Sequence, residues 1–265
     1  MPGSSSLQAL IFDMDGTLAD TEAHGHRVAF NAAFRDFGLD WNWDLATYGT
    51  LLSVAGGKER IAFYLSRYRP DFRHPDLPGF IAALHQAKTR HFQRILEAGE
   101  IPLRPGVARL IAEAREAGLR LAIATTAALP GVVTLLETTL GSDSPSWFDA
   151  IGAGDVVPRK KPAPDIYLWV LERMKLRPEA CLAIEDSGPG LRAAGGAGLA
   201  TIITVSDYTR GHDFSGAVLV LSDLGEPDAP FRVLQGDAAG FDFVSVEALR
   251  AWHGREMPQR GQSKS

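Results

Sequence analysis

Short apolar runs recur along the chain, and each of them ends at a polar residue. The four clearest runs cover residues 9–12, 119–125, 181–185 and 200–205. Each run is almost continuously apolar, which is typical of strands that are buried on both faces of a parallel sheet. A weaker run at 217–221 predicts one more strand.

Helical patterns separate these strands. Apolar side chains recur at intervals of three and four, which indicates helices with one buried face. The positions are Val107, Leu110, Ile111 and Ala114 between Pro105 and Gly118, then Ile166, Trp169, Val170 and Met174, and then Leu191 with Ala194. Strands that alternate with helices predict an α/β fold with a doubly wound, Rossmann-like parallel sheet.

One segment, 21–103, interrupts this alternation with helix after helix and no convincing strand. One stripe consists of Phe30, Ala33, Phe34 and Phe37, and a longer one of Phe80, Leu84, Ala87, His91, Phe92, Ile95 and Leu96. We therefore expect an inserted helical cap at 21–103 and a core formed by 7–20 and 104–250. The polar ends, 1–6 and 254–265, are expected to be flexible tails.

Charge and composition exclude several classes of partner. The 265 residues are 45% hydrophobic and 22% charged, with a formal charge of -5. Nucleic acids and anionic membranes select basic surfaces, so neither is expected as a partner.

The single cysteine, Cys181, lies in an apolar run and predicts a buried thiol in a reducing compartment. With no 18-residue apolar run and no secretory leader, we expect a cytoplasmic protein, or a plastid stromal one if the chain is a processed form. We also expect a monomer.

Polar side chains stand where the predicted strands end. They are Asp13 and Asp15 after the first strand, Thr125 at the end of the second, Glu185 and Asp186 after the third, and Lys161 in the loop "RKKPAP". Each alone is an ordinary turn or loop residue. Because ligands bind at the carboxyl ends of the strands in such sheets, these groups are expected to converge. Together they suit Mg²⁺-assisted phosphoryl transfer, with a small-molecule sugar phosphate as the expected partner.

The stretches that hold these residues carry a family resemblance. "FDMDGTLADTE", "AIATT", "KKPAPDIY" and "AIEDSGPGLRAA" resemble, in order, the four motifs of the haloacid dehalogenase superfamily phosphatases. Stretches outside these motifs, such as "GGKERIAFYL" and "LRPGVARLI", resemble the CbbY-like sugar phosphatases that are associated with the Calvin cycle.

This resemblance implies roles for the residues at the strand ends. Asp13 would be the nucleophile and Asp15 the general acid and base, while Thr125 and Lys161 would bind the phosphoryl group. Lys160 is the alternative to Lys161. The Asp13 carboxylate, the Asp15 main-chain carbonyl and Asp186 would hold Mg²⁺.

Other positions of these motifs stay open. Glu185 would be either a ligand of the metal or a partner of its ligands. Thr126 would contact the substrate. Ala127 and Ala128 replace the hydroxyl and amide residues that many relatives carry, so side-chain contacts to the substrate are not expected there.

In the cap, the resemblance implies a group of residues that grips the remote phosphate of a sugar bisphosphate. They are Glu22, Gly56, Gly57, Lys58, Glu59, Arg60, His85 and Lys88. The implied reaction is the hydrolysis of xylulose 1,5-bisphosphate to xylulose 5-phosphate. His24 and His26 compete for a position near the hinge, and the stretch 225–243 has no assigned role.

Two other functions remain open. A β-phosphoglucomutase-like enzyme would share the motifs and the cap but return the phosphoryl group to a sugar. A non-catalytic sugar-phosphate binding protein would keep the scaffold without turnover. A metal-independent dehalogenase is disfavoured because those enzymes lack the second aspartate, which is present here as Asp15.

Overall fold

The computed structural model describes residues 6–54 and 56–253 and divides into two compact units. We call Thr21–Ile101 the inserted unit, and Met1–Asp20 together with Pro102–Ser265 the core unit. The predicted flexible tails, 1–6 and 254–265, lie outside the described residues except for Ser6.

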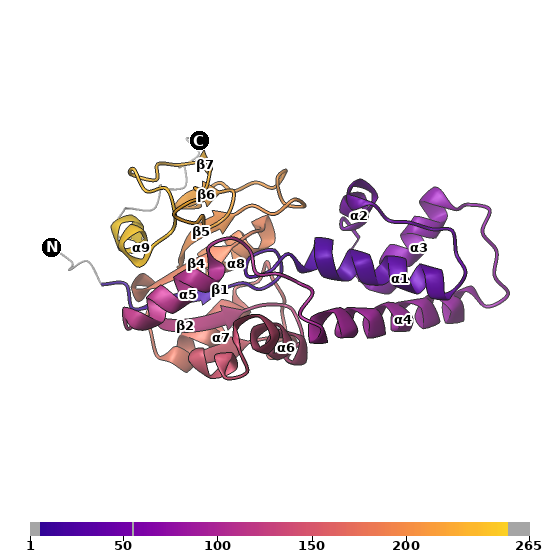
Figure 1. The fold of residues 1–265 in the computed structure, drawn as a ribbon, viewed down its shortest axis with the longest axis horizontal. Helices are drawn as coiled ribbons and strands as arrows, with labels where there is room; N and C mark the ends of the chain where they lie inside the picture. Colours follow the sequence, from indigo (N-terminus) through magenta and orange to yellow (C-terminus); the bar gives the residue numbers. More distant parts are fainter. Residues whose placement is uncertain (1–5, 55, 254–265) are drawn as a thin grey trace, which may run out of the picture. The chain divides into compact units, whose positions relative to one another are not determined.

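A seven-stranded sheet forms the centre of the core unit (Figure 1). The strand order is β3-β2-β1-β4-β5-β6-β7, and every neighbouring pair is parallel except β6 with β7. The strands are β1 (Ala9–Phe12), β2 (Arg120–Ala124), β3 (Ala150–Gly152), β4 (Cys181–Glu185), β5 (Ala200–Thr204), β6 (Leu219–Leu221) and β7 (Val233–Gln235). This arrangement confirms the predicted doubly wound sheet.

Five of these strands were predicted and two were missed. The apolar runs predicted β1, β2, β4, β5 and β6. β3 has three residues and ends in a glycine, so it leaves little pattern in the sequence. β7 lies in the unassigned stretch 225–243, and all three of its residues are exposed, so it lacks the apolar run of a buried strand.

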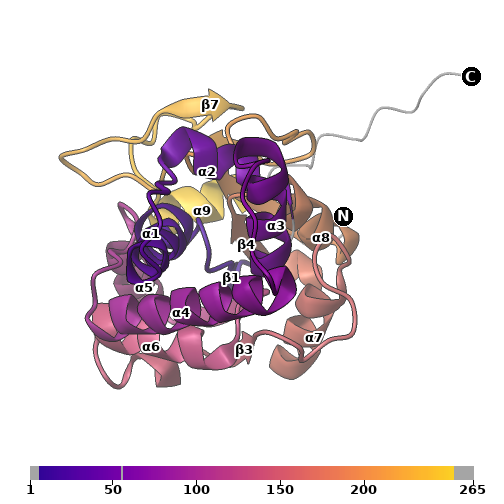
Figure 2. The ribbon, with the colours of Figure 1, turned by 90° about the vertical axis from the view of Figure 1, so that its right-hand side faces the viewer.

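Helices cover both faces of this sheet. They are α5 (Val107–Glu116), α6 (Leu129–Leu140), α7 (Asp165–Met174), α8 (Gly188–Gly196) and α9 (Val246–His253), with short 3₁₀ turns η2 (Ser144–Trp147) and η3 (Pro178–Ala180). The chain steps outward from β1 to β3 and then returns to β4, and right-handed crossovers place the helices of the two halves on opposite faces. α7 and α8 share a core cluster with Ile11 and Ala183, while α5 and α9 pack together on the other side (Figure 2).

The strand register brings two acidic residues together at the end of the sheet. Phe12 of β1 pairs with Ile184 of β4, and the Asp13 N–H donates to the Ile184 carbonyl at 3.0 Å. One residue farther along, Asp13 therefore lies beside Glu185. Because side chains alternate between faces, both point to the face that Ile11 and Ala183 share with α7 and α8.

The described residues of the inserted unit contain helices and no strand. A π-helical turn, η1 (Glu22–His26), precedes α1 (Arg27–Asp36), α2 (Leu45–Leu51), α3 (Gly57–Tyr68) and α4 (Leu77–Glu97). α1 packs along α4. The unit has an aromatic core in which the Trp43 ring lies 4.5 Å from Phe30 and 4.9 Å from Phe34, measured between ring centroids.

At two helical positions the burial of the side chain differs from what the predicted stripes indicate. Phe37 caps the end of α1 and is 37% exposed, so its predicted place in the core was wrong. Lys88, which the apolar stripe of α4 did not include, is only 9% exposed. Its aliphatic stem fits a buried position provided that its ammonium finds partners.

A buried side chain, Asn31, ties α1 to the loop that follows it. Its amide donates to the Trp43 carbonyl at 2.9 Å and accepts from the Trp43 N–H at 2.8 Å. We expect Asn31→Ala to lower the free energy of unfolding by about 2–4 kcal/mol, because two backbone groups lose their partner inside the core. Urea unfolding followed by tryptophan fluorescence measures this, with exposed Asn42→Ala as the matched control. Equal stability of the two variants would contradict this role of Asn31.

Candidate active site

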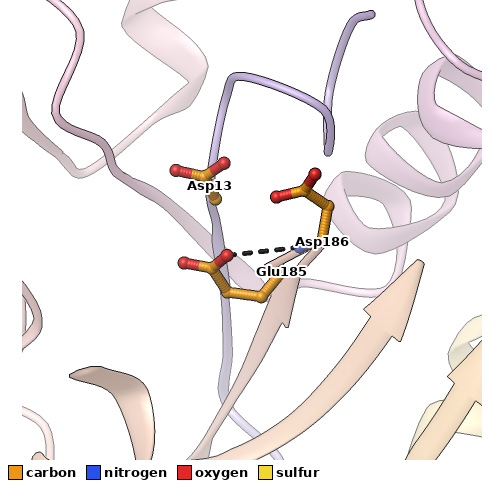
Figure 3. Close-up of side chains that lie close together, drawn as sticks. All are labelled: Asp13, Glu185 and Asp186. Carbon is orange, nitrogen blue, oxygen red and sulfur yellow. Dashed lines mark hydrogen bonds between the residues drawn. The ribbon is translucent and has the colours of Figure 1, made fainter. Parts of the chain in front are cut away.

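Three buried carboxylates gather where β1 and β4 end. Asp13, Glu185 and Asp186 each offer an oxygen, and these atoms lie within 4.8 Å of one another (Figure 3). All three residues are buried, and Glu185 is completely so. Clustered carboxylate oxygens are the ligands that Mg²⁺ prefers, so these residues fit a divalent metal ion.

The Lys161 ammonium lies against two of these carboxylates. Its Nζ donates to Asp13 Oδ1 and to Glu185 Oε1, each at 2.6 Å. Lys160, the alternative, instead pairs with the exposed Asp155 at 2.7 Å and donates to the Gly154 carbonyl. The contacts therefore favour Lys161 as the lysine of the site.

Burial and mutual repulsion shift the protonation of the cluster. Burial raises the pKa of Asp13 to about 7 against the attraction of Lys161, and the carboxylates of Glu185 and Asp15 contribute to the rise. Burial, and then the Asp13 and Glu185 carboxylates, raise the pKa of Asp186 well above its usual range. Although burial opposes it, the two carboxylates beside Lys161 raise the pKa of that ammonium. A bound cation would relieve the repulsion between the carboxylates.

Glycines leave the space that two of the carboxylates occupy. A Cβ on Gly16 would lie 2.3 Å from Asp186 Oδ2, and Gly16 has a φ of +84° that favours glycine. A Cβ on Gly190 would lie 1.9 Å from Glu185 Oε2. Any larger residue at either position would displace a carboxylate.

Two further residues touch the cluster and were missed at the sequence level. Tyr167 Oη donates to Glu185 Oε1 at 2.7 Å, and Ser206 Oγ donates to Asp186 Oδ2 at 2.8 Å. Tyr167 lies within the motif "KKPAPDIY", and Ser206 lies two residues after the end of β5. The rule that ligands bind at strand ends marks Ser206 as a candidate.

The remaining predicted core residues lie around the same strand ends. Asp15 is partly exposed and acts electrostatically on Asp13. Thr125 follows β2 and is buried, and its Oγ1 accepts from the Ala127 N–H at 3.1 Å, so its own hydroxyl proton is available to another acceptor. Thr126 and Ala128 are exposed.

In the inserted unit, Arg60 is linked through Tyr48 to Glu22, another of the predicted binding residues. Its guanidinium donates to Tyr48 Oη at 3.1 Å and to the Leu51 carbonyl at 3.2 Å. Tyr48 Oη in turn donates to Glu22 Oε2 at 2.6 Å. Tyr48 was not predicted, because a tyrosine at this position is expected to belong to the aromatic core.

A second group in the inserted unit is formed by Lys88 and His26. Lys88 Nζ lies 2.8 Å from His26 Nδ1 and about 5 Å from the ring centres of Phe30 and Phe92. Burial, and then the positive charges of Lys88 and Arg60, lower the pKa of His26 well below its usual range, so His26 is neutral and accepts. His24 is exposed, so this contact favours His26 over His24.

The other predicted cap residues lie near the start of α3 and on α4. Lys58, Glu59 and Gly56 are exposed. A Cβ on Gly57 would lie 2.4 Å from His85 Nε2, so this glycine allows the imidazole to approach the backbone. Burial, and then Lys88 and Lys58, lower the pKa of His85.

Comparison with known proteins decides the family. The family model of haloacid dehalogenase-like hydrolases matches residues 7–198. The chain belongs to this family. The haloacid dehalogenase-like hydrolases that it resembles include the plasmid-encoded CbbY protein of Cupriavidus necator, which is 51% identical over 93% of this chain and 97% of the relative. The predicted resemblance to CbbY and the prediction of a phosphatase are confirmed.

Solved structures of haloacid dehalogenase-like hydrolases agree with this assignment. CbbY from Rhodobacter sphaeroides in complex with phosphate is 47% identical with a TM-score of 0.68, over 82% of this chain and 94% of that one. A mutant of the same protein in complex with xylulose-(1,5)bisphosphate gives the same values. Compared by sequence, the phosphorylated carbohydrates phosphatase of Thermotoga maritima is 31% identical over 75% of this chain and 85% of the relative.

None of the helices in residues 6–54 and 56–253 is long and apolar enough to cross a membrane.

The raised pKa of Asp13 predicts how Mg²⁺ and pH act on stability together. The folded protein holds this proton more tightly than the unfolded chain, so stability without metal falls as pH rises from about 4 through about 7. Mg²⁺ must displace the proton at low pH but meets free carboxylates at high pH. We therefore expect Mg²⁺ to raise the Tm more at about pH 8 than at about pH 6.

Differential scanning calorimetry with and without Mg²⁺ measures this effect. Asp186→Asn, which removes one of the clustered carboxylates, is expected to lose most of the rise in Tm. A rise that is equal at both pH values, or larger at the lower one, would contradict metal binding at this cluster.

Proposed function

We propose that this protein is a Mg²⁺-dependent sugar-phosphate phosphatase that acts through an aspartyl-phosphate on Asp13. The observation that carries the proposal is the cluster of Asp13, Glu185, Asp186 and Lys161 at the end of the sheet, in a chain about half identical to CbbY. The buried carboxylates supply a nucleophile and metal ligands, and the ammonium supplies a partner for phosphoryl oxygens.

In the first step, a carboxylate oxygen of Asp13 attacks the phosphorus. The bond between phosphorus and the sugar oxygen breaks, and Asp15 gives its proton to that oxygen. Lys161 and the hydroxyl of Thr125 donate to the phosphoryl oxygens. Asp13, Asp186, the main-chain carbonyl of Asp15 and Glu185 would hold the metal, which when bound offsets the negative charge of the phosphoryl group.

In the second step, Asp15 returns as a base. It takes a proton from water, the water oxygen attacks phosphorus, and the bond to Asp13 breaks. Phosphate leaves, and the free carboxylate of Asp13 is restored. The net reaction is hydrolysis of the phosphate ester, with Asp15 returned to its protonated form.

For the substrate we propose xylulose 1,5-bisphosphate, with xylulose 5-phosphate as the product. CbbY from Rhodobacter sphaeroides, which is 47% identical, has been solved in complex with xylulose-(1,5)bisphosphate. The inserted unit supports a substrate with a second phosphate group, because it gathers several basic side chains. These are Arg60, Lys88, Lys58 and two histidines. We propose that this group, with Glu22, Gly56, Gly57 and Glu59, recognises the second phosphate.

Two alternatives predict different products. A β-phosphoglucomutase-like enzyme would isomerise a sugar phosphate in the presence of a bisphosphate primer and release little phosphate. A non-catalytic binding protein would retain its ligand unchanged. A panel of sugar mono- and bisphosphates with Mg²⁺, scored for free phosphate and for isomers, separates all three. The expectation of a monomer in the cytoplasm or plastid stroma stays a prediction.

The nucleophile is tested by Asp13→Asn. An amide is a far poorer nucleophile than a carboxylate, so we expect phosphate release to fall by about 10⁴-fold or more. Acid quenching with a ³²P-labelled bisphosphate is expected to leave label on the wild-type protein and none on the variant. Asp71→Asn, at an exposed position of the inserted unit, is the matched control. Turnover by Asp13→Asn at the wild-type rate would contradict the mechanism.

The proposed phosphate site of the inserted unit is tested by Arg60→Ala. Loss of a charged hydrogen-bond donor to the second phosphate is expected to raise the KM for xylulose 1,5-bisphosphate about 10-fold or more. The KM for p-nitrophenyl phosphate, which has no second phosphate, is expected to stay within about 2-fold. Arg67→Ala, at an exposed position of the same helix, is the control. An equal change for both substrates would refute the substrate assignment while leaving the phosphatase chemistry intact.

A further inference from the structure

The carboxylate of Asp186 has a fixed neighbour that the mechanism above does not use. Ser206, in the loop after β5, donates its hydroxyl to Asp186 Oδ2 at 2.8 Å. Ser206 is 6% exposed and Asp186 is 5% exposed, so this hydrogen bond is shielded from water. A shielded hydrogen bond to a charged oxygen is stronger than an exposed one.

Thr209 determines the direction of the hydrogen bonds around Ser206. Thr209 Oγ1 accepts from the Ser206 N–H at 2.9 Å and lies 3.0 Å from Ser206 Oγ. The single hydroxyl proton of Ser206 goes to Asp186 Oδ2, so at its contact with Thr209 the Ser206 oxygen can only accept. The hydroxyl of Thr209 lies 3.0 Å from Ser206 Oγ and 3.5 Å from the Ser206 carbonyl. The shorter contact favours donation to Ser206 Oγ, which gives a chain of donors from Thr209 through Ser206 to Asp186.

Arg104 holds the backbone on both sides of this carboxylate. Its guanidinium donates to the carbonyls of Thr204 and Val205, each at 2.8 Å, just before Ser206. It also donates to the carbonyl of Gly16. A Cβ on Gly16 would collide with Asp186 Oδ2. The backbone at Gly16 is therefore packed against the same oxygen that Ser206 binds.

From these contacts we propose that Ser206 is a positioning residue that fixes the orientation of Asp186 for Mg²⁺, with Thr209 and Arg104 supporting it. The inference rests on the proposed metal-dependent function and assigns a role to the loop after β5. With Oδ2 held by Ser206 and blocked by Gly16, the carboxylate cannot rotate freely about its terminal bond. A ligand that is already oriented loses less entropy when the ion binds.

The loss of such a supporting partner weakens metal binding without removing a ligand. Substitution of residues that orient metal ligands typically lowers affinity about 10- to 100-fold. We expect Ser206→Ala to raise the Kd for Mg²⁺ within this range, about 10- to 100-fold. A residue with a purely structural role would change the Tm and leave the Kd as it is.

Isothermal titration of the full-length protein with Mg²⁺ tests this role directly. The variants are Ser206→Ala, Asp186→Asn and Ser144→Ala. Ser144 is the matched control, because it is completely buried and its hydroxyl has no hydrogen-bond partner among the described residues. We expect the Kd of Ser144→Ala to equal that of the wild type. If Ser206→Ala does not fold, Ser206→Cys replaces it, since a thiol keeps nearly the same volume but is a weak donor.

The outcomes separate this inference from the proposed function. The role of Ser206 is supported if the wild type binds Mg²⁺, Asp186→Asn does not, and Ser206→Ala binds it at least about 10-fold more weakly. Wild-type binding that is lost in Asp186→Asn but unchanged in the Ser206 variant overturns that role and leaves the metal site intact. If the wild type binds no Mg²⁺, or Asp186→Asn binds it equally well, the proposed metal-dependent function fails, and the role of Ser206 fails with it.

Discussion

The buried carboxylates of Asp13, Glu185 and Asp186 lie close enough to repel one another, and the surrounding residues must hold them together. One ammonium, that of Lys161, pairs with two of them, and burial raises the pKa of both Asp13 and Asp186. Such a cluster costs stability unless further positive charge offsets it. The same cost makes the site suitable for a divalent ion, which offsets the charge of the carboxylates and allows a negatively charged phosphate to approach.

The fold supplies the means to hold these charges at close range. The register of the parallel pair β1 and β4 is sufficient to place Asp13 beside Glu185. Glycines at positions 16 and 190 leave room for the carboxylates, where any Cβ would collide. The segment after β5 brings a hydroxyl to the third carboxylate. Strand ends and tight turns of the core unit therefore fix the positions of the carboxylates at the site.

Much of this could be predicted from the sequence, and the exceptions have physical reasons. Buried strands appear as apolar runs, so β1, β2, β4, β5 and β6 were predicted, whereas the three-residue β3 and the exposed β7 leave no such pattern. The carboxylates and Lys161 follow from motifs at strand ends. Ser206 and Tyr48 do not follow from these motifs. The partner of a hydroxyl in a turn, or of a tyrosine in an aromatic core, is known only from the folded chain. The burial of Lys88 likewise depends on His26, which lies on another element.

We propose that one divalent ion lies between the carboxylates of Asp13 and Asp186. Crystals soaked in Mn²⁺, which accepts the same oxygen ligands as Mg²⁺, give an anomalous difference map that locates the ion directly. We expect one strong peak within coordination distance of both Asp13 and Asp186. A well-ordered map with no peak at that position, or with an ion bound elsewhere and these carboxylates unchanged, would contradict it.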